Sequence, residues 1–325
     1  MKAVRVHAFG GPEVLTIENI TRPVPAEDEI LVKVYASGVN PVDWVVREGG
    51  NEMLRSFLTL PMTLGWDAAG IVEEVGSGVI GFQQGDAVYG LPNFPGTNGS
   101  YADYCAAKAG QFAPKPKSLG FNEAAGVPLA GLTAWTALFA DGKLQPGQRI
   151  LIQGASGGVG SLAVQFAKAK GAYVIGLASA DNLEYLKQLG ADEVVDYRNQ
   201  PFDELVRDVD IVLEASPLRD NGERLRSVTV LKAGGILVSV NVDFPFDEAV
   251  LAALAAKQAT GELTANQPRQ DWLTEIAQLI DEGRVRVHIS RVFPLEQVAE
   301  AHRESQTYHV RGKLILEVRK EGEPG

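Results

Sequence analysis

The chain has 325 residues, which is too long for one ordinary core and suits two domains at roughly 150 residues each. Hydrophobic residues make up 45% and charged residues 22%, and this balance excludes a disordered or collagen-like chain. The formal net charge of −11 argues against a nucleic-acid partner, because nonspecific binding to phosphates depends on clustered Lys and Arg.

Cysteine is scarce, and no segment has the composition of a membrane anchor. Cys105 is the single cysteine, so no intramolecular disulfide forms, which fits a reducing compartment. Residues 1–7 lack the apolar run of a signal peptide, and no stretch approaches the roughly 18 apolar residues of a membrane span. We therefore expect a cytoplasmic protein without a membrane partner.

Residues 1 to about 120 consist of short alternating segments separated by Gly and Pro. Residues 29–35 and 69–75 have the period-two or β-branched character of strands. A succession of such strands with few helices predicts a small, irregular β-barrel.

After about residue 120, short apolar strands alternate with helical periodicity. The expected strands are 148–152, 173–177, 194–195, 210–213 and 235–239, and the expected helices are 159–170, 182–189 and 223–232. This alternation requires right-handed crossovers and a buried parallel sheet, so the second domain is predicted to be doubly wound α/β.

The C-terminal segment carries no motif of its own. We expect a helix over 271–282, a strand over 285–289, a helix over 296–306 and a strand over 313–318. Periodicity alone assigns these elements to neither domain. The tail, 319–325, is expected to be frayed.

A glycine-rich turn between a predicted strand and a predicted helix is the main chemical signal. This is the context in which glycines let a dinucleotide pyrophosphate approach the backbone and the N–H groups of the following helix. The strict pattern is not met, because Ala155 stands where the first glycine is expected. The alternative is a glycine-rich helix entry that binds nothing. The predicted cofactor contacts here are Ala155, Ser156, Gly157, Gly158, Val159 and Gly160.

The end of the second strand indicates which dinucleotide is bound. An NAD enzyme usually has an Asp or Glu there for the ribose hydroxyls, whereas this strand ends in small residues, 176–180. Ser179 and Asn182 are therefore predicted donors to a 2′-phosphate, with Arg198 or Lys187 as charge partners, so NADPH is expected in preference to NADH. The alternative is that Asp181 binds the ribose, but its expected position is the N-cap of the next helix.

Several motifs follow one another in a fixed order over nearly the whole chain. They are residues 36–44, 65–72, 99–104, 125–128, 155–160, 189–192 and 312–313. In these motifs the chain resembles the medium-chain dehydrogenase/reductase superfamily, and within it the zinc-independent quinone and enone oxidoreductases. The resemblance implies a GroES-like catalytic domain, residues 1–120 and 269–325, around a Rossmann dinucleotide-binding domain, residues 121–268.

The metal-bearing members of that superfamily provide the nearest alternative, a zinc-type alcohol dehydrogenase. A catalytic zinc needs three protein ligands, and those relatives have a Cys and a His where this chain has Asn40 and Trp66. Their structural zinc requires four cysteines. The remaining spaced pair, His302 and His309, is expected on a solvated surface, so no metal is predicted.

The resemblance implies a metal-free hydride transfer from NADPH to a small-molecule acceptor. The acceptor is a quinone or the double bond of an α,β-unsaturated ketone or aldehyde, because oxidation of an alcohol is difficult without a Lewis acid. A homodimer is the family's expected assembly. A non-catalytic NADPH-binding structural or sensor protein is a further alternative, and no proton donor is assigned.

The remaining site residues are carried over from matching family positions. Asn40 and Trp44 are expected to border the nicotinamide and substrate, although Asn40 alternatively serves only as a turn residue and Trp44 only as a core aromatic. Thr133 is expected near the nicotinamide or its phosphate, or else caps a helix. Tyr197 is expected at the adenosine end, unless it is simply a surface residue. Cofactor contacts are also expected from the strand-end residues Ser216, Ser239 and Asn241 and from Arg311 and Lys313, the last two being alternatively solvated.

Overall fold

The computed structural model describes residues 1–50 and 52–322, which form two compact units. Unit 1 comprises Met1–Leu132, Gln267–Glu282 and Val287–Gly325, and unit 2 comprises Thr133–Asn266 and Gly283–Arg286. The first boundary lies after residue 132 rather than 120, since the helix that starts at Phe121 packs on unit 1. The ring of Phe121 stacks on Tyr35 with centroids 4.4 Å apart.

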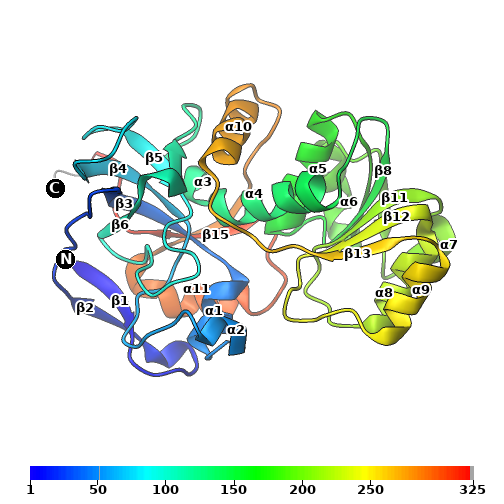
Figure 1. Cartoon of the computed structure of the whole chain (residues 1–325), viewed down its shortest axis with the longest axis horizontal. Helices are drawn as coiled ribbons and strands as arrows, with labels where there is room; N and C mark the ends of the chain where they lie inside the picture. Colours follow the sequence, from blue (N-terminus) through cyan, green and yellow to red (C-terminus); the bar gives the residue numbers. More distant parts are fainter. Residues whose placement is uncertain (51, 323–325) are drawn as a thin grey trace. The chain divides into compact units, whose positions relative to one another are not determined.

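Unit 2 is built on a six-stranded parallel sheet (Figure 1). The strand order is β10-β9-β8-β11-β12-β13, so the chain moves outward from β8 first in one direction and then in the other. This order confirms the predicted doubly wound α/β fold and places a topological switch point between β8 and β11. The strands are β8 (Arg149–Gln153), β9 (Tyr173–Ala178), β10 (Glu193–Asp196), β11 (Val209–Glu214), β12 (Leu231–Ser239) and β13 (Thr260–Leu263).

Helices link the strands of unit 2 and account for its apolar sequence. Central strand residues such as Leu151, Val212 and Leu237 are fully buried, as expected for a parallel sheet covered on both faces. The helices are α4 (Pro128–Trp135, shared with unit 1), its π-helical continuation η3 (Thr136–Asp141), α5 (Gly158–Ala169), η4 (Ala180–Asn182), α6 (Leu183–Gln188), α7 (Phe202–Leu205), α8 (Asn221–Val230) and α9 (Glu248–Ala256).

Unit 1 contains a seven-stranded sheet and a separate two-stranded sheet. The long strand β3 pairs antiparallel with β4, β6 and β15, and its register with β4 shifts twice, which matches the expected irregular β-structure. The strands are β1 (Lys2–Val6), β2 (Leu15–Asn19), β3 (Glu29–Val39), β4 (Ala68–Val75), β5 (Ala87–Gly90), β6 (Tyr104–Lys108), β7 (Phe112–Pro114), β14 (Ile289–Pro294) and β15 (Lys313–Glu317).

The pairing of β15 with β3 brings the C-terminal segment into unit 1, an assignment that periodicity left open. The helices of this unit are short apart from α10. They are η1 (Pro12–Val14), α1 (Pro41–Arg47), α2 (Glu52–Arg55), η2 (Ala109–Gln111), α3 (Phe121–Ala125), α10 (Gln270–Asp281), η5 (Leu295–Gln297) and α11 (Val298–Ser305).

The bounds of two predicted elements are wrong, and in each case a specific contact explains the difference. The strand expected over 285–289 starts only at Ile289, because both backbone groups of Arg286 are bonded to the side-chain amide of Gln165. The helix expected over 223–232 ends at Val230, since Leu231 already pairs with β11 as part of β12.

Two residues of the tail, which was expected to be frayed, form hydrogen bonds with other residues of unit 1. The backbone N–H of Arg319 donates to the carbonyl of Tyr35 at 3.1 Å, and Glu321 accepts from the N–H of Phe121 at 2.9 Å. Residues 323–325 of the expected frayed tail lie outside the described residues. Within 1–50 and 52–322, no helix is long and apolar enough to cross a membrane.

Candidate functional site

The turn between β8 and α5 is held by close backbone packing. Gly154 has a φ of +65°, a left-handed conformation that favours glycine. A Cβ at Gly160 would lie 2.2 Å from the carbonyl oxygen of Gly154 and 2.7 Å from the Cα of Ala155, which is itself fully buried. Gly154 and Gly160 are therefore required by the fold of the turn.

Gly157, at the N-cap of α5, has a different environment. Its φ is −76°, and a Cβ there would meet just one group, the carbonyl oxygen of Gly154 at 3.4 Å. As the N-cap residue, Gly157 has no side chain with which to cap the helix, and the N–H groups of the first turn have no intrahelical acceptor. Ser156, Gly158 and Val159 are half-buried around this position. The turn is thus an uncapped backbone cradle of the kind that fits a dinucleotide pyrophosphate.

Polar side chains follow β9 and β10 at the same edge of the sheet. Asn182 Nδ2 donates to Ser179 Oγ at 3.1 Å, and the backbone N–H of Tyr197 donates to the carbonyl of Ala178 at 3.3 Å. The Arg198 guanidinium lies 5.7 Å from the centre of the half-exposed Tyr197 ring. The predicted adenosine-side residues are thereby brought together.

Asp181 is not the N-cap that the sequence suggested. It lies inside the 3-10 turn Ala180–Asn182, whose N-cap is Ser179, while Asn182 is the N-cap of α6. The Asp181 side chain is exposed.

The residues predicted after β11 and β12 are also close together, but they mainly bond to one another. Asn241 Nδ2 donates to the carbonyl of Ser216 at 2.9 Å and to Glu214 Oε1 at 3.1 Å. Ser239 is fully buried, and its Oγ accepts from the N–H of Asn241 at 3.1 Å and from Arg224 at 3.3 Å. Sequence reasoning missed Glu214 and Arg224, because neither belongs to a recognised motif.

Thr133 is buried inside α4 and is not a helix cap. Its Oγ1 accepts from Asn266 Nδ2 at 3.1 Å, so α4 is joined to the segment that follows β13. Both residues belong to unit 2.

In unit 1, Asn40 belongs to a buried polar network rather than to a simple turn. Asn40 is the N-cap of α1, and its Nδ2 donates to Asp67 Oδ2 at 2.8 Å. Lys313 Nζ donates to the carbonyl of Val39 at 3.1 Å, to Asp67 Oδ2 at 3.3 Å and to Asn40 Oδ1. These three contacts match the three N–H groups of an ammonium, so Lys313 is buried within unit 1 and not solvated.

Asp43 and Tyr101 extend this network. Asp43 Oδ2 accepts from the backbone N–H of Asn40 at 2.6 Å and from the hydroxyl of Tyr101 at 2.8 Å. Burial raises the pKa of Asp43 to about 7, and burial together with the Asp43 carboxyl raises the pKa of Tyr101 well above its usual range. Asp43 and Asp67 lie inside the quoted family motifs, which was the available signal for them.

Trp44 and Arg311 occupy different environments. Trp44 is only 8% exposed, donates from Nε1 to Ser305 Oγ at 3.2 Å, and meets the Tyr308 ring edge-on with centroids 5.6 Å apart. It therefore packs α1 against α11. Arg311 is half-buried. Burial of the His288 imidazole and the positive charge of Arg311 together lower the pKa of His288.

The donor atoms of unit 1 do not fit a zinc site. Trp66 is fully buried and donates to the carbonyl of Gly96 at 3.2 Å, while burial raises the pKa of Cys105 to about 12. His302, expected on the surface, is instead buried, and its Nδ1 accepts from Arg47 at 3.1 Å. Over the described range there is no group of three or more His, Cys, Asp or Glu that could hold a metal ion.

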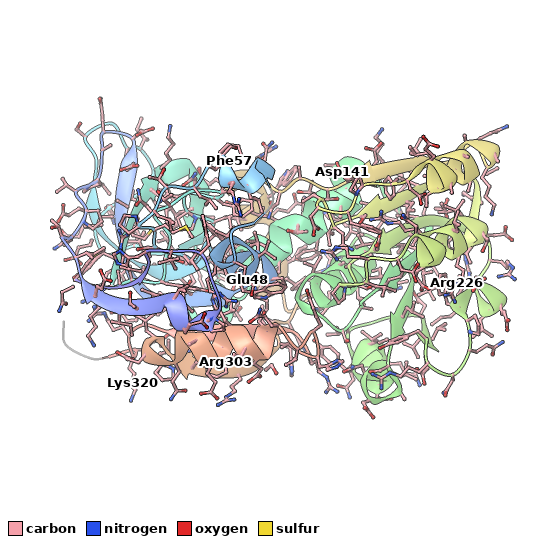
Figure 2. The ribbon with its side chains drawn as sticks, turned by 90° about the horizontal axis from the view of Figure 1, so that it is seen from below. Glu48, Phe57, Asp141, Arg226, Arg303 and Lys320 are labelled. Atoms are coloured by element: carbon pink, nitrogen blue, oxygen red, sulfur yellow. The ribbon has the colours of Figure 1, made fainter. Side chains whose placement is uncertain are left out.

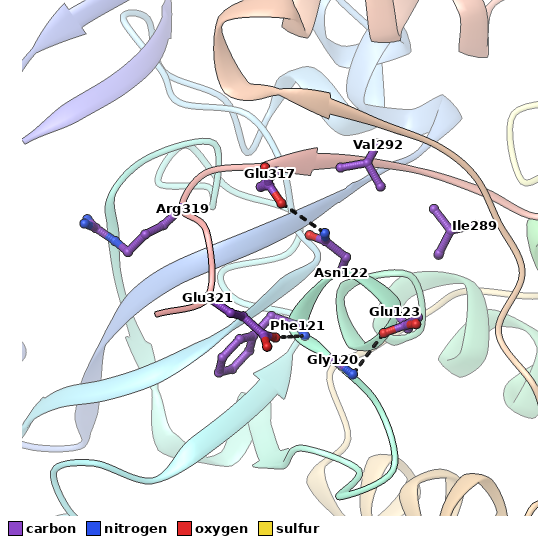
Figure 3. Close-up of a pocket in the computed structure, with 9 residues that line it drawn as sticks. All are labelled: Gly120, Phe121, Asn122, Glu123, Ile289, Val292, Glu317, Arg319 and Glu321. Carbon is purple, nitrogen blue, oxygen red and sulfur yellow. Dashed lines mark hydrogen bonds between the residues drawn. The ribbon is translucent and has the colours of Figure 1, made fainter. Parts of the chain in front are cut away.

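A pocket of about 420 Å³ in unit 1 is lined by residues of α3, β14 and the segment from Glu317 to Glu321 (Figure 3). None of the predicted site residues lines it. Its carboxylates serve the fold: Glu123 accepts from the N–H of Gly120, Glu317 from Asn122 and Glu321 from the N–H of Phe121.

Comparison with known proteins identifies the family. Residues 26–117 match the family model described as alcohol dehydrogenase GroES-like domain, and residues 189–316 match the one described as zinc-binding dehydrogenase. An NADPH-dependent alkenal/one oxidoreductase of Arabidopsis thaliana is 35% identical over 326 residues, covering 97% of this chain and 79% of the relative.

Solved structures also resemble nearly the whole chain. The quinone oxidoreductase from Coxiella burnetii has a TM-score of 0.89 and 34% identity, covering 98% of this chain and 99% of that one. The Escherichia coli quinone oxidoreductase complexed with NADPH has a TM-score of 0.84 and 30% identity, covering 97% and 99%. The chain therefore belongs to the medium-chain dehydrogenase/reductase superfamily, in the group that contains the quinone and alkenal/one oxidoreductases.

Proposed function

We propose that this protein is an NADPH-dependent, metal-free oxidoreductase that reduces a quinone or the double bond of an α,β-unsaturated ketone or aldehyde. The supporting observation is the uncapped cradle at Gly157, located after β8 next to the switch point of the sheet. In this proposal unit 2 is the dinucleotide-binding domain and unit 1 is the catalytic domain.

The preference for NADPH is proposed from the end of β9. Ser179 and Asn182 supply small polar groups where an NAD enzyme usually has an acid, and Arg198 lies over the neighbouring Tyr197 ring. Asp181 is exposed in the turn between Ser179 and Asn182. If the protein bound NADH instead, Asp181 would be the residue that bonds to the ribose hydroxyls.

When bound, the reduced nicotinamide supplies the hydride, and the protein binds and orients the reactants. The N–H groups at the start of α5 hold the pyrophosphate. Asn40 and Trp44 are the proposed border of the acceptor pocket. Asn40 is held by Asp67 and Lys313, and Trp44 by Ser305, so both side chains are fixed in orientation.

The test is turnover with a panel of quinones, alkenals and enones, followed by the absorbance of the reduced nicotinamide with NADPH and with NADH. We expect turnover of at least one acceptor and a lower KM for NADPH. Tight NADPH binding without turnover of any acceptor would instead indicate a binding protein. An equal or lower KM for NADH would contradict the cofactor preference, and stoichiometric zinc in the active protein would contradict the metal-free chemistry.

The variant Gly157→Val tests the cradle. Its backbone conformation suits any residue and its Cβ position is nearly open, so the fold should survive. NADPH binding should be lost, because the side chain occupies the space proposed for the pyrophosphate. Binding that persists in a folded variant would place the cofactor elsewhere.

The proposal includes a homodimer in the cytoplasm, the assembly and location expected from the family resemblance. Light scattering of the purified protein and fractionation of its native cells test these two statements separately.

A further inference from the structure

The ion pair between Arg224 and Glu214 is the most deeply buried pair of charges in the described part of unit 2. Their side chains are 1% and 6% exposed, and Arg224 Nε donates to Glu214 Oε2 at 2.9 Å. Arg224 lies in α8, and Glu214 is the last residue of β11. Removing two charges from water is expensive, so a buried ion pair is weak evidence for stability, and its value lies in the groups that it holds in place.

Arg224 reaches the end of β12 and the segment that follows. Nη2 donates to Ser239 Oγ at 3.3 Å, and Nη1 donates to the carbonyl of Pro245 at 3.0 Å. The guanidinium also lies 4.3 Å from the ring centre of Phe244 and 4.7 Å from that of Phe246. One side chain thus fixes β12 and its following loop to α8, with the planar geometry that only arginine supplies.

Glu214 connects the same loop to the end of β11. Its Oε2 is bonded to Arg224, while its Oε1 accepts from Asn241, which also donates to the carbonyl of Ser216. The ion pair therefore determines the positions of two strand ends, 214–216 and 239–241. Both lie at the carboxyl edge of the sheet, where doubly wound folds bind ligands.

The topology indicates which half of a dinucleotide these strand ends face. The glycine turn follows β8, and the group that addresses the adenosine ribose follows β9. β11 and β12 lie on the other side of β8 in the strand order. A dinucleotide whose pyrophosphate lies at Gly157 and whose adenosine lies over β9 must extend its nicotinamide half over β11 and β12.

We propose that Arg224 and Glu214 are positioning residues for the nicotinamide half of the cofactor. They hold residues 214–216 and 239–241 in the arrangement that receives the nicotinamide ring, and they do not contribute to the adenosine half. This inference rests on the proposed function.

The experiment compares two ligands, NADPH and 2′-phospho-ADP-ribose, which lacks the nicotinamide. The main variant is the double substitution Arg224→Met with Glu214→Gln, which removes both charges with little change in volume and so leaves no unpaired buried charge. Arg224→Lys is the second variant, because it keeps the charge beside Glu214 but lacks the fork that reaches Ser239 and Pro245. The matched control is Arg226→Met on the same helix (Figure 2). Arg226 is 45% exposed and pairs with Glu223.

We expect the double variant to bind NADPH at least tenfold more weakly, with a comparable fall in kcat at saturating NADPH. Its affinity for 2′-phospho-ADP-ribose should change less than twofold. Arg224→Lys should show the same selective loss to a smaller degree, and Arg226→Met should match the wild type for both ligands.

The two proposals fail in different ways. Wild-type protein that binds neither ligand refutes the proposed function. Wild-type binding of both ligands with variants that lose neither, or lose both equally, refutes the positioning role and leaves the proposed function standing. Circular dichroism of every variant identifies folded samples, and Arg224→Lys decides the question if the double variant does not fold.

Discussion

Burial of the Asp43 carboxyl has a consequence for stability that depends on pH. Its pKa rises from 3.8 to about 7, mainly through burial. The folded protein therefore holds a proton on Asp43 between about pH 4 and pH 7 that the unfolded chain releases. The stability that this proton contributes is complete below the unfolded pKa and is lost as pH rises through the folded pKa.

The size of the effect follows from the same change in pKa. At about 1.4 kcal/mol for each tenfold change in proton affinity, the rise corresponds to a loss of at most about 4 kcal/mol between pH 4 and pH 7. Asp43→Asn removes the titration while keeping a carbonyl to accept from Asn40 and Tyr101. The free energy of unfolding of the variant minus that of the wild type should therefore increase steadily as pH rises from 4.5 to 7.5.

Urea denaturation of wild type and Asp43→Asn at half-unit pH intervals provides the measurement. The control is Asp28→Asn, because Asp28 is 63% exposed in an ion pair with Lys108, and losing such a surface pair should change the free energy of unfolding by less than about 1 kcal/mol. The slope is compared rather than the absolute stability, since Asp43 Oδ1 has no hydrogen-bond partner within the described residues and an amide there carries its own penalty. Parallel profiles for wild type and Asp43→Asn would refute the reasoning.

Three further predictions concern His302, Lys313 and Gly160. For His302 the pH dependence of stability should run in the opposite direction from that of Asp43. Burial lowers the pKa of His302 to about 3, so the stability that the neutral imidazole contributes is present above about pH 6.5 and is lost as pH falls. The free energy of unfolding in urea should therefore differ less between pH 6.5 and pH 4.5 in His302→Gln than in the wild type, and equal differences would contradict burial of a neutral imidazole. Lys313→Met should lower the free energy of unfolding by about 3–5 kcal/mol, because it leaves the Asp67 carboxylate buried without its cation. Its control, Lys2→Met, removes an exposed pair with Glu296 and should lower the free energy of unfolding by less than about 1 kcal/mol. Equal losses measured by urea denaturation would contradict the buried network. Gly160→Ala should lower the melting temperature and reduce the free energy of unfolding by about 1–3 kcal/mol, because the new Cβ meets the carbonyl of Gly154. The control, Gly157→Ala, should melt like the wild type. Similar melting temperatures for the two variants would show that the turn is not tightly packed.

The sequence by itself was sufficient where structure is local. The turn after β8 and the start of α5 were predicted to within one residue, because glycine conformations and apolar periodicity are properties of a few adjacent residues. The absence of the usual zinc ligands was also readable, since it depends only on which residue types stand at the motif positions.

Tertiary structure decided the features that depend on distant partners. His302 is buried because Arg47, 255 residues earlier, donates to it, and Lys313 is buried because it reaches Asp67, 246 residues earlier. Arg286 is kept out of a strand by Gln165, 121 residues away. No local pattern encodes such pairs, because charge and amide groups look the same in sequence whether solvent or a distant side chain satisfies them. The chain alone therefore determined most elements, the glycine turn after β8 and the absence of the usual zinc ligands. Folding decided which polar side chains remain available to a ligand and which hold the protein together.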